Sequence, residues 1–212
     1  MRQYDSIPFG NAKTFGSGPW MVFDKLDGSN LRVEVHTKKG NFTKWGSRKV
    51  LMDVSNEANI LTKAVGIFES HYEAATILQY LRTFSKNSLF TLYFEFVGLQ
   101  SFAGQHEEDD THELRLLDIW EEKRGFIPSS DLTRAFPLFV PNSLGTIFEL
   151  GAEFLAAVQG GTLEGMGMEG VILKHPNLRT YNSKNPRMMK IKRSDWIQKV
   201  QAKHKNDWQE YI

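Results

Sequence analysis

Hydrophobic and polar positions along the chain follow two periods, and the shorter of the two predicts strands near the beginning of the sequence. The ranges 20–24, 31–37 and 41–46 are rich in β-branched and aromatic residues, and "LRVEVH" places an apolar residue at every second position. The stretch "TKKGN" between the second and third ranges is a turn signal. We therefore expect a hairpin there, with one face of its first strand exposed to solvent.

The longer period indicates helices. Apolar residues recur at helical spacing through 55–85, which predicts a helix in two pieces. The residues of this stripe are Ile60, Leu61, Ala64, Val65 and Phe68 in the first piece and Ile77, Leu78, Leu81 and Phe84 in the second. The segment "SSDLTRAF" opens with a capping signature and predicts a short helix. We expect a longer helix over 143–158, ended by Gly160 and Gly161.

Four further ranges, 88–98, 114–120, 169–175 and 187–193, have the composition of strands, and the first is densely aromatic. Strands that pair locally and are interspersed with helices favour an α+β fold with mostly antiparallel sheets flanked by helices. We expect one domain over 1–193 and a short polar tail, 194–212, for which a helix is one interpretation. No separate C-terminal domain is expected.

Composition and charge narrow the function classes. The chain has 212 residues, of which 41% are hydrophobic, so it can build a sizeable core. Its formal charge of +1 excludes a global basic field for nucleic acid, so such a partner would be bound by local patches. The absence of Cys excludes disulfides and thiolate chemistry. Without an apolar run of about 18 residues, we expect a soluble, cytoplasmic, monomeric protein with no membrane contact.

Two stretches resemble binding motifs but have the wrong context. "GMGMEG" at 165–170 matches G-x-G-x-x-G, yet it follows a predicted helix and precedes a predicted strand, the reverse of the order in dinucleotide folds. "HEEDDTHE" at 106–113 is typical of a solvated acidic loop rather than a metal site. The sequence also contains no P-loop.

The segment "FDKLDGSN" at 23–30 places a lysine and an Asp-Gly turn directly after an apolar strand. A solvated turn is the simpler interpretation, and a lysine nucleophile at the mouth of a nucleotide pocket is the alternative. Four other short segments follow in order, each on or beside a predicted strand: "GSRK" (46–49), "LYFEFVG" (92–98), "EGVILK" (169–174) and "MKIK" (189–192). Each segment alone has a structural explanation, but the ordered set is specific.

Together these five segments resemble the covalent nucleotidyltransferases, the superfamily of polynucleotide ligases and mRNA capping enzymes. The resemblance spans about residues 20–193, and K-x-D-G-S-N with Asn30 is most similar to the RNA ligase branch. It implies the nucleotidyltransferase fold and an ATP-dependent RNA ligase that joins 5′-phosphate and 3′-hydroxyl ends through a lysyl-AMP intermediate, with a role in nucleic-acid repair. DNA ligase and capping guanylyltransferase remain alternatives, as does a binding module that has lost turnover.

The resemblance assigns roles to particular residues. It implies catalytic roles for Lys25, Glu169, Lys190 and Lys192. It implies nucleotide contacts by Asp24, Lys25, Asn30, Arg48, Glu95, Leu117, Lys190 and Lys192. It implies that Glu169 and Glu95 help to hold a divalent metal, and that Asp27 and Gly28 shape the turn that presents the nucleophile. Strand alternation independently places Lys190 and Lys192 on one face of a strand.

The chemistry explains why these residue types occur together. A lysine that attacks the α-phosphorus of ATP must be neutral, and lowering its pKa from about 10.4 to near 7.5 costs on the order of 4 kcal/mol. Burial and neighbouring cations supply such a shift. ATP and Mg²⁺ or Mn²⁺ are the expected cofactors, and RNA is favoured over DNA as the partner. One departure is Leu117, which stands where the family usually has an aromatic residue that stacks on adenine.

Overall fold

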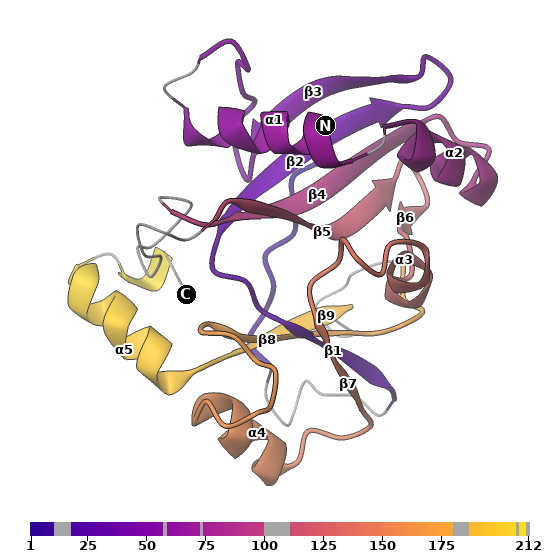
Figure 1. Ribbon diagram of the computed structural model, residues 1–212. Coiled ribbons are helices and arrows are strands. Elements are labelled where there is room, and N and C mark those ends of the chain that lie inside the picture. The colour runs from indigo at the N-terminus through magenta and orange to yellow at the C-terminus, as the bar shows by residue number, and fades with distance from the viewer. Residues whose placement is uncertain are drawn as a thin grey trace. The chain divides into compact units, whose positions relative to one another are not determined.

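The structure of the protein is a computed structural model that describes residues 1–10, 18–56, 59–72, 74–99, 111–179, 187–206 and 208–210. Contacts divide the chain into two compact units. Unit 1 consists of Met1–Asp5 and Gly28–Val140, and unit 2 consists of Ser6–Asp27 and Pro141–Ile212. Each unit has its own sheet and its own hydrophobic core (Figure 1).

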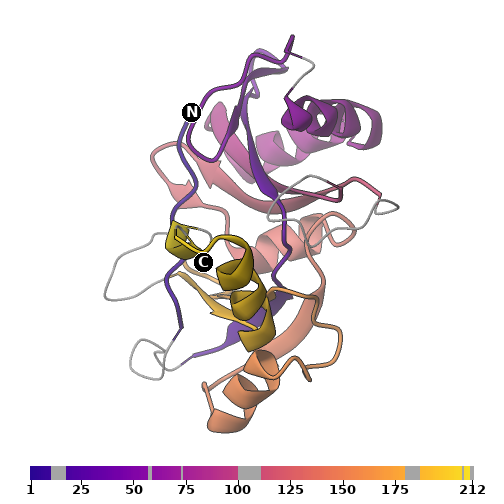
Figure 2. The same ribbon diagram turned by 90° about the vertical axis from the view of Figure 1, so that its left-hand side faces the viewer.

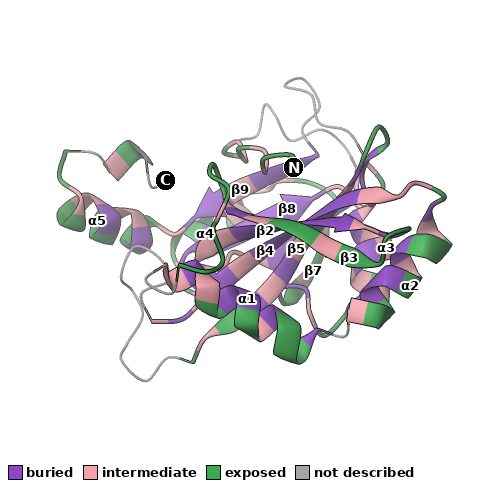
Figure 3. Cartoon of the chain, turned by 90° about the horizontal axis from the view of Figure 1, so that it is seen from above, coloured by how far each residue is buried: buried purple, intermediate pink, exposed green. Residues whose placement is uncertain are grey.

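Unit 1 contains an antiparallel sheet with the strand order β3-β2-β4-β5-β6. Its strands are β2 (Ser29–His36), β3 (Asn41–Ser47), β4 (Leu89–Val97), β5 (Glu113–Glu121) and β6 (Gly125–Phe126). The predicted hairpin of β2 and β3 is confirmed, but the expected exposed face of β2 is wrong, because Arg32 and Glu34 are both buried. The turn of the hairpin places Gly40 at a φ of 68°, where glycine is favoured. Figure 3 shows β2 and β4 largely buried and the edge strand β3 largely exposed.

The helices of unit 1 are α1 (Ile60–His71), α2 (Ala74–Phe84) and α3 (Ser129–Ala135), so the two-piece helix and the short helix are both confirmed. Asn59 is the N-cap of α1, because its side chain accepts a hydrogen bond from the backbone N–H of Leu61. The apolar stripes of α1 and α2 join the inner residues of β2, β4 and β5 in one aromatic-rich core. The helices therefore bury the predicted stripes on their inner faces.

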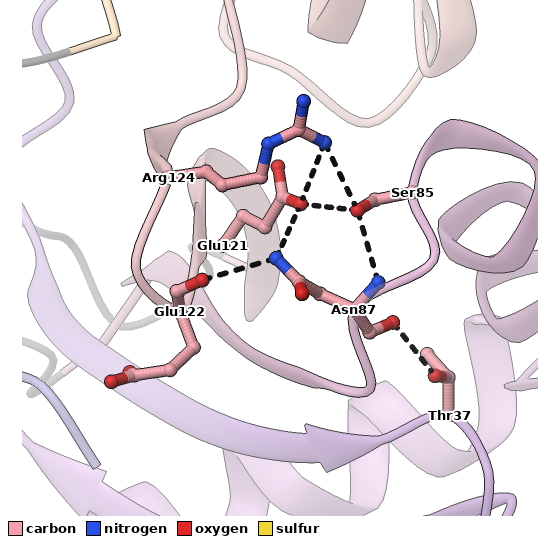
Figure 4. Close-up of polar contacts among 6 residues, drawn as sticks. All are labelled: Thr37, Ser85, Asn87, Glu121, Glu122 and Arg124. Carbon is pink, nitrogen blue, oxygen red and sulfur yellow. Dashed lines mark hydrogen bonds and ion pairs between the residues drawn. The ribbon is translucent and has the colours of Figure 1, made fainter.

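A buried carboxylate fastens the end of α2 to the sheet of unit 1 (Figure 4). Glu121, at the end of β5, is fully buried and accepts hydrogen bonds from the Ser85 hydroxyl and, at 2.8 Å, from the Asn87 side-chain amide. The Arg124 guanidinium lies 3.3 Å from the same carboxylate oxygen. A buried carboxylate is costly unless it is paired and hydrogen-bonded, and here several donors satisfy it.

Unit 2 contains a second antiparallel sheet, with the strand order β7-β1-β8-β9. Its strands are β1 (Trp20–Asp24), β7 (Ser143–Ile147), β8 (Gly170–Lys174) and β9 (Met188–Lys192). Its helices are α4 (Ala152–Gln159), α5 (Ser194–Lys203) and the 3-10 turn η1 (Trp208–Glu210). In Figure 2, α4 is the orange helix near the bottom of the view, and it contacts β8 and β9. Helix α5 begins two residues after β9 ends.

One predicted helix is wrong over its first part. The range 143–158 begins with strand β7, and only Ala152–Gln159 is helical. Gly145 has a φ of 111° and is the Cα partner of Val22 in β1, so the backbone there cannot be helical. Pairing with the edge of β1 outweighs the helical spacing of the apolar residues. The predicted C-terminal end at Gly160 is confirmed.

Two further expectations concern loops and membranes. Residues 106–110 of the acidic stretch lie outside the described residues, whereas 111–113 are described. "GMGMEG" lies between α4 and β8, so a strand follows it and the dinucleotide motif is correctly rejected. Within the described ranges, no helix combines the length and apolar character that crossing a membrane requires.

Candidate active site

Lys25 directly follows β1 and is held by pairing with β8. Its backbone N–H donates a 2.9 Å hydrogen bond to the carbonyl oxygen of Gly170, which continues the β1–β8 ladder by one residue. Its side chain is 18% exposed, and Nζ lies 2.7 Å from Oε2 of Glu169. The side chain of the lysine is therefore partly accessible, while its backbone is fixed by the sheet.

Glu169 occupies the centre of the site, because its carboxylate is shared between two lysines. Oε2 contacts Lys25, and Oε1 lies 2.7 Å from Nζ of Lys192, whose side chain is only 2% exposed. The side chain of Glu169 is itself 5% exposed. Two ammonium groups and one carboxylate leave a net positive charge in a region that is largely out of water, which favours the binding of an anion.

Gly170 makes this arrangement possible. It has a φ of 135°, and a Cβ built on it would lie 2.1 Å from the carbonyl oxygen of Ile191 and 2.8 Å from Cα of Lys192. Only glycine permits such a close approach of β8 to β9. Because Gly170 and Lys192 are Cα partners, the close approach brings the preceding residue, Glu169, to Lys192.

The two lysines of β9 differ in their surroundings. Lys190 is half-buried, and its Nζ lies 4.6 Å from the ring centroid of Phe9, a residue that forms a parallel bridge with Lys190. Burial lowers the pKa of Lys192 to about 8, the positive charge of Lys25 acts in the same direction, and the carboxylate of Glu169 opposes the shift. Ile191, between them, is buried in the core of unit 2, as the alternation predicts.

Asp24, the residue before Lys25, holds the loop that carries Glu169. Its Oδ1 accepts a 2.8 Å hydrogen bond from the backbone N–H of Gly167. On the other side of that residue, Arg193 donates a 3.2 Å hydrogen bond to the carbonyl oxygen of Gly167 and pairs with Asp195. Burial raises the pKa of Asp24, and the negative charge of Glu169 adds to this effect. The loop is thus fixed by a residue of β1 and by the residue that links β9 to α5.

The remaining candidate residues belong to unit 1. Asn30 in β2 and Glu95 in β4 are Cα partners, and the Asn30 amide donates a 3.2 Å hydrogen bond to the carbonyl oxygen of Phe94. Leu117 is half-buried at an irregularity of β5, between the paired residues Leu116 and Asp118. Arg48 is exposed just after β3. The structure therefore brings Asp24, Lys25, Glu169, Lys190 and Lys192 together in unit 2, and it places Asn30, Arg48, Glu95 and Leu117 on the sheet and hairpin of unit 1.

Three residues of the site were not found from the sequence. Gly170, Arg193 and Trp196 have no assigned role in the sequence motifs, although Gly170 lies within one of them. Trp196 is buried on α5 and shares one helical face with Val200, so its spacing indicates ordinary core packing. Only the long-range contacts identify these residues.

Comparisons with known proteins show the fold. No family model matches the sequence, and no curated protein is similar to it. The structure is similar to that of a Naegleria gruberi RNA ligase with PPi, with a TM-score of 0.66 and 17% identity over 94% of this chain and 58% of the ligase chain. A lysine-to-alanine variant of that ligase with ATP and Mn, and a glutamate-to-alanine variant with AMP and Mn, each give a TM-score of 0.66 and 16% identity over the same shares.

The expected α+β nucleotidyltransferase fold is therefore confirmed. The chain spans 58% of the length of that RNA ligase. What the likeness establishes is the fold, because the sequences are 17% identical or less. The roles of individual residues stay predictions, which rest on their geometry and chemistry.

Proposed function

We propose that this protein is an ATP-dependent RNA ligase that forms a covalent lysyl-AMP intermediate on Lys25. One observation carries the proposal: a partly exposed lysine, fixed by its backbone to a sheet, shares a buried carboxylate with a second lysine. A buried structural ion pair needs one cation for each carboxylate, whereas the second cation here supplies the positive field that a transferred phosphate requires.

The residues of the site have separate tasks in the adenylylation step. Neutral Lys25 attacks the α-phosphorus of ATP, so that an N–P bond forms, the bond from that phosphorus to the bridging oxygen breaks, and pyrophosphate leaves with its electron pair. The amine loses one proton to solvent as the phosphoramidate forms. Glu169 lies 2.7 Å from Nζ of Lys25 and orients the amine by accepting its hydrogen bond. Lys190 and Lys192 donate to the phosphate oxygens, where negative charge builds.

A divalent metal fits the donor set of the site. Mg²⁺ is commonly bound through one or two carboxylates together with substrate phosphates, and Glu169 offers such a carboxylate. Within the described part of the chain, no cluster of three or more His, Asp or Glu side chains could hold a metal by itself. This pattern suits a metal that arrives with the nucleotide. When bound, it would neutralise phosphate charge, with Glu169 holding it and Glu95 as the second proposed carboxylate.

The later steps are proposed from the same chemistry. The AMP moves from Lys25 to the 5′-phosphate of a nucleic-acid end, and a 3′-hydroxyl then displaces AMP to form the phosphodiester bond. Asn30, Arg48, Glu95 and Leu117 are proposed to contact the nucleotide and the 5′-phosphate. We favour RNA over DNA as the partner, an intracellular setting where ATP is available, and a monomeric enzyme, which a sizing column checks.

A labelling experiment tests the first step. The protein is incubated with α-labelled ATP and Mg²⁺ and then denatured, and we expect acid-labile label on the wild-type chain and none on Lys25→Ala. Lys199→Ala is the matched control, because Lys199 is an exposed lysine on α5, and it should label like wild type. Label from GTP alone would indicate a capping activity, and folded protein that takes label from neither nucleotide would refute the proposal.

A sealing experiment tests the substrate. Nicked and single-stranded RNA and DNA with 5′-phosphate ends are offered with ATP, and joining is scored on a denaturing gel. We expect joining of RNA ends and weaker joining of DNA ends. Efficient joining of DNA with none of RNA would make the protein a DNA ligase.

A further inference from the structure

Trp196 lies outside the five sequence motifs, yet it contacts residues from two of them. It is the third residue of α5, which begins two residues after Lys192, and it is 1% exposed. Its ring face lies against Lys192, and its ring nitrogen lies against Asp27 in the turn after Lys25. One side chain thus joins the segment of the proposed nucleophile to the basic strand β9.

The contact with Lys192 is a cation–π interaction at short range. Nζ of Lys192 lies 3.8 Å from the centroid of the Trp196 ring, and the same Nζ lies 2.7 Å from Glu169. Indole is the most favourable of the aromatic rings for such a contact, and the interaction is strongest where water is excluded. The position of the ammonium is therefore set by two partners, one on the loop before β8 and one on α5.

The contact with Asp27 fixes the ring. Nε1 of Trp196 donates a 3.2 Å hydrogen bond to Oδ2 of Asp27, and both side chains are buried. A ring held at its edge by Asp27 cannot rotate its face away from Lys192 without losing this bond. Trp196 consequently fixes the position of the Lys192 ammonium relative to the turn that follows Lys25.

The chemical nature of this second partner has an electrostatic consequence. A carboxylate at the position of Trp196 would add a negative charge beside Lys192, in a region that already contains Glu169, Asp24 and Asp27. An indole ring stabilises the ammonium through its π electrons and carries no net charge. Lys192 is therefore held in place while the site keeps the positive field that a phosphate group needs.

We propose that Trp196 is a positioning residue for adenylylation, which holds the Lys192 ammonium at the transferred phosphate through its ring face and through Asp27. The role rests on the proposed function. It makes α5 part of the reaction centre, although the sequence indicates only a polar tail there. Because Trp196 acts through Lys192, it should affect the rate at saturating ATP more than the apparent affinity for ATP.

Three variants of the full chain separate positioning from packing. Trp196→Phe keeps a ring face and loses the N–H donor, and Trp196→Leu loses both. Val200→Ala is the matched control, because Val200 is equally buried on α5 and its substitution loosens the packing of the helix while the indole ring itself is retained. Thermal unfolding confirms that each variant is folded. We expect the single-turnover rate of label transfer at saturating ATP to fall about tenfold in Trp196→Leu, and to stay within about threefold of wild type in Trp196→Phe and Val200→Ala.

A spectroscopic measurement reports the placement directly and needs no ATP. Protons above the face of an aromatic ring are shielded, so the Hε protons of Lys192 should resonate upfield in protein labelled with ¹³C-lysine. Lys192→Arg assigns the signal. We expect the shielding to be lost in Trp196→Leu, to be kept in part in Trp196→Phe and to be unchanged in Val200→Ala.

The outcomes separate this role from the proposed function. Wild-type protein that forms no adduct refutes the proposed function and this role with it. Wild-type protein that forms the adduct, together with a Trp196→Leu variant that reacts equally fast or keeps the shielded signal, refutes only the role of Trp196. An equal loss of rate in Val200→Ala also overturns it, because general packing of α5 would then be sufficient.

Discussion

Glu121 in unit 1 and Glu169 in unit 2 are both buried carboxylates, but their partners differ in kind. Glu121 accepts from a hydroxyl and an amide on short side chains, and the half-exposed Arg124 completes the group. Glu169 contacts the tips of two lysines, which are long and flexible. Short donors satisfy one carboxylate, whereas an ammonium has three N–H donors and can bind a phosphate while it contacts a carboxylate. The first arrangement stabilises a fold, and the second suits a reaction.

The largest expected difference comes from neutralising each carboxylate. Glu169→Gln should slow adenylylation by about 100-fold or more, because the negative charge between the two lysines is lost and one of the two acceptor oxygens becomes an N–H donor. Glu121→Gln should leave the rate within about threefold and lower the free energy of unfolding by about 1–3 kcal/mol. For both variants, single-turnover labelling measures the rate of adenylylation and urea unfolding measures the free energy of unfolding. A Glu121→Gln variant that is inactive while folded would contradict the comparison.

An intermediate effect is expected from the two arginines. Arg193→Ala removes the hydrogen bond to Gly167 that helps to fix the loop of Glu169, and should slow adenylylation about three- to tenfold. Arg124→Ala removes a guanidinium that is 57% exposed, and should change the free energy of unfolding by less than about 0.5 kcal/mol with no change in rate. Equal rates for Arg193→Ala and wild type would show that Asp24 alone fixes the loop.

The smallest effect is a trend with pH. Burial lowers the pKa of Lys192 to about 8 in the folded protein, compared with about 10.5 in the unfolded chain. Between these values the unfolded chain binds more protons, so the stability of the folded state rises with pH. In EDTA, wild type should therefore gain stability relative to Lys192→Met from pH 8 to pH 10, by roughly 1 kcal/mol per pH unit.

The same pH series on Glu121→Gln gives the control. The partners drawn in Figure 4 are a hydroxyl, an amide and a guanidinium, so the difference in unfolding free energy between this variant and wild type should stay constant from pH 8 to pH 10. The prediction for Lys192 is contradicted if the stability advantage of wild type over Lys192→Met, measured as free energy of unfolding, stays constant or falls from pH 8 to pH 10. Burial would then not disfavour the charged form of Lys192.

Local patterns predicted most of the fold, and long-range contacts explain what they missed. Alternation and aromatic content located the hairpin and every strand except β6 and β7, and helical spacing located α1 and α2. Strand β7 was missed because its residues resemble the start of a helix, and pairing with β1 decides their structure. The available signal was Gly145 itself, because glycine is unfavourable in a helix interior.

The candidate site was predicted in part, for a related reason. The ordered motifs identified Lys25, Glu169 and Lys192, which the structure brings together. Periodicity could not find Trp196, because a buried tryptophan on a helical stripe has the pattern of core packing. Glu121 likewise directly follows the predicted strand 114–120, where a solvated residue is expected. It is buried because Ser85 and Asn87, just after α2, donate hydrogen bonds to it.

Under the proposed function, the sharing of one carboxylate by two lysines implies that the net charge of these groups changes sign when Lys25 is adenylylated. Lys25 and Lys192 count as +2 and Glu169 as −1, so these three groups carry +1 before the reaction. A phosphoramidate on Lys25 removes one positive charge and adds one negative, so the same three groups then carry −1. The groups that attract the triphosphate of ATP would afterwards repel a second polyanion. Pyrophosphate would be repelled after it leaves Lys25-AMP, and a second nucleotide would be excluded. The reverse reaction with pyrophosphate would therefore be disfavoured.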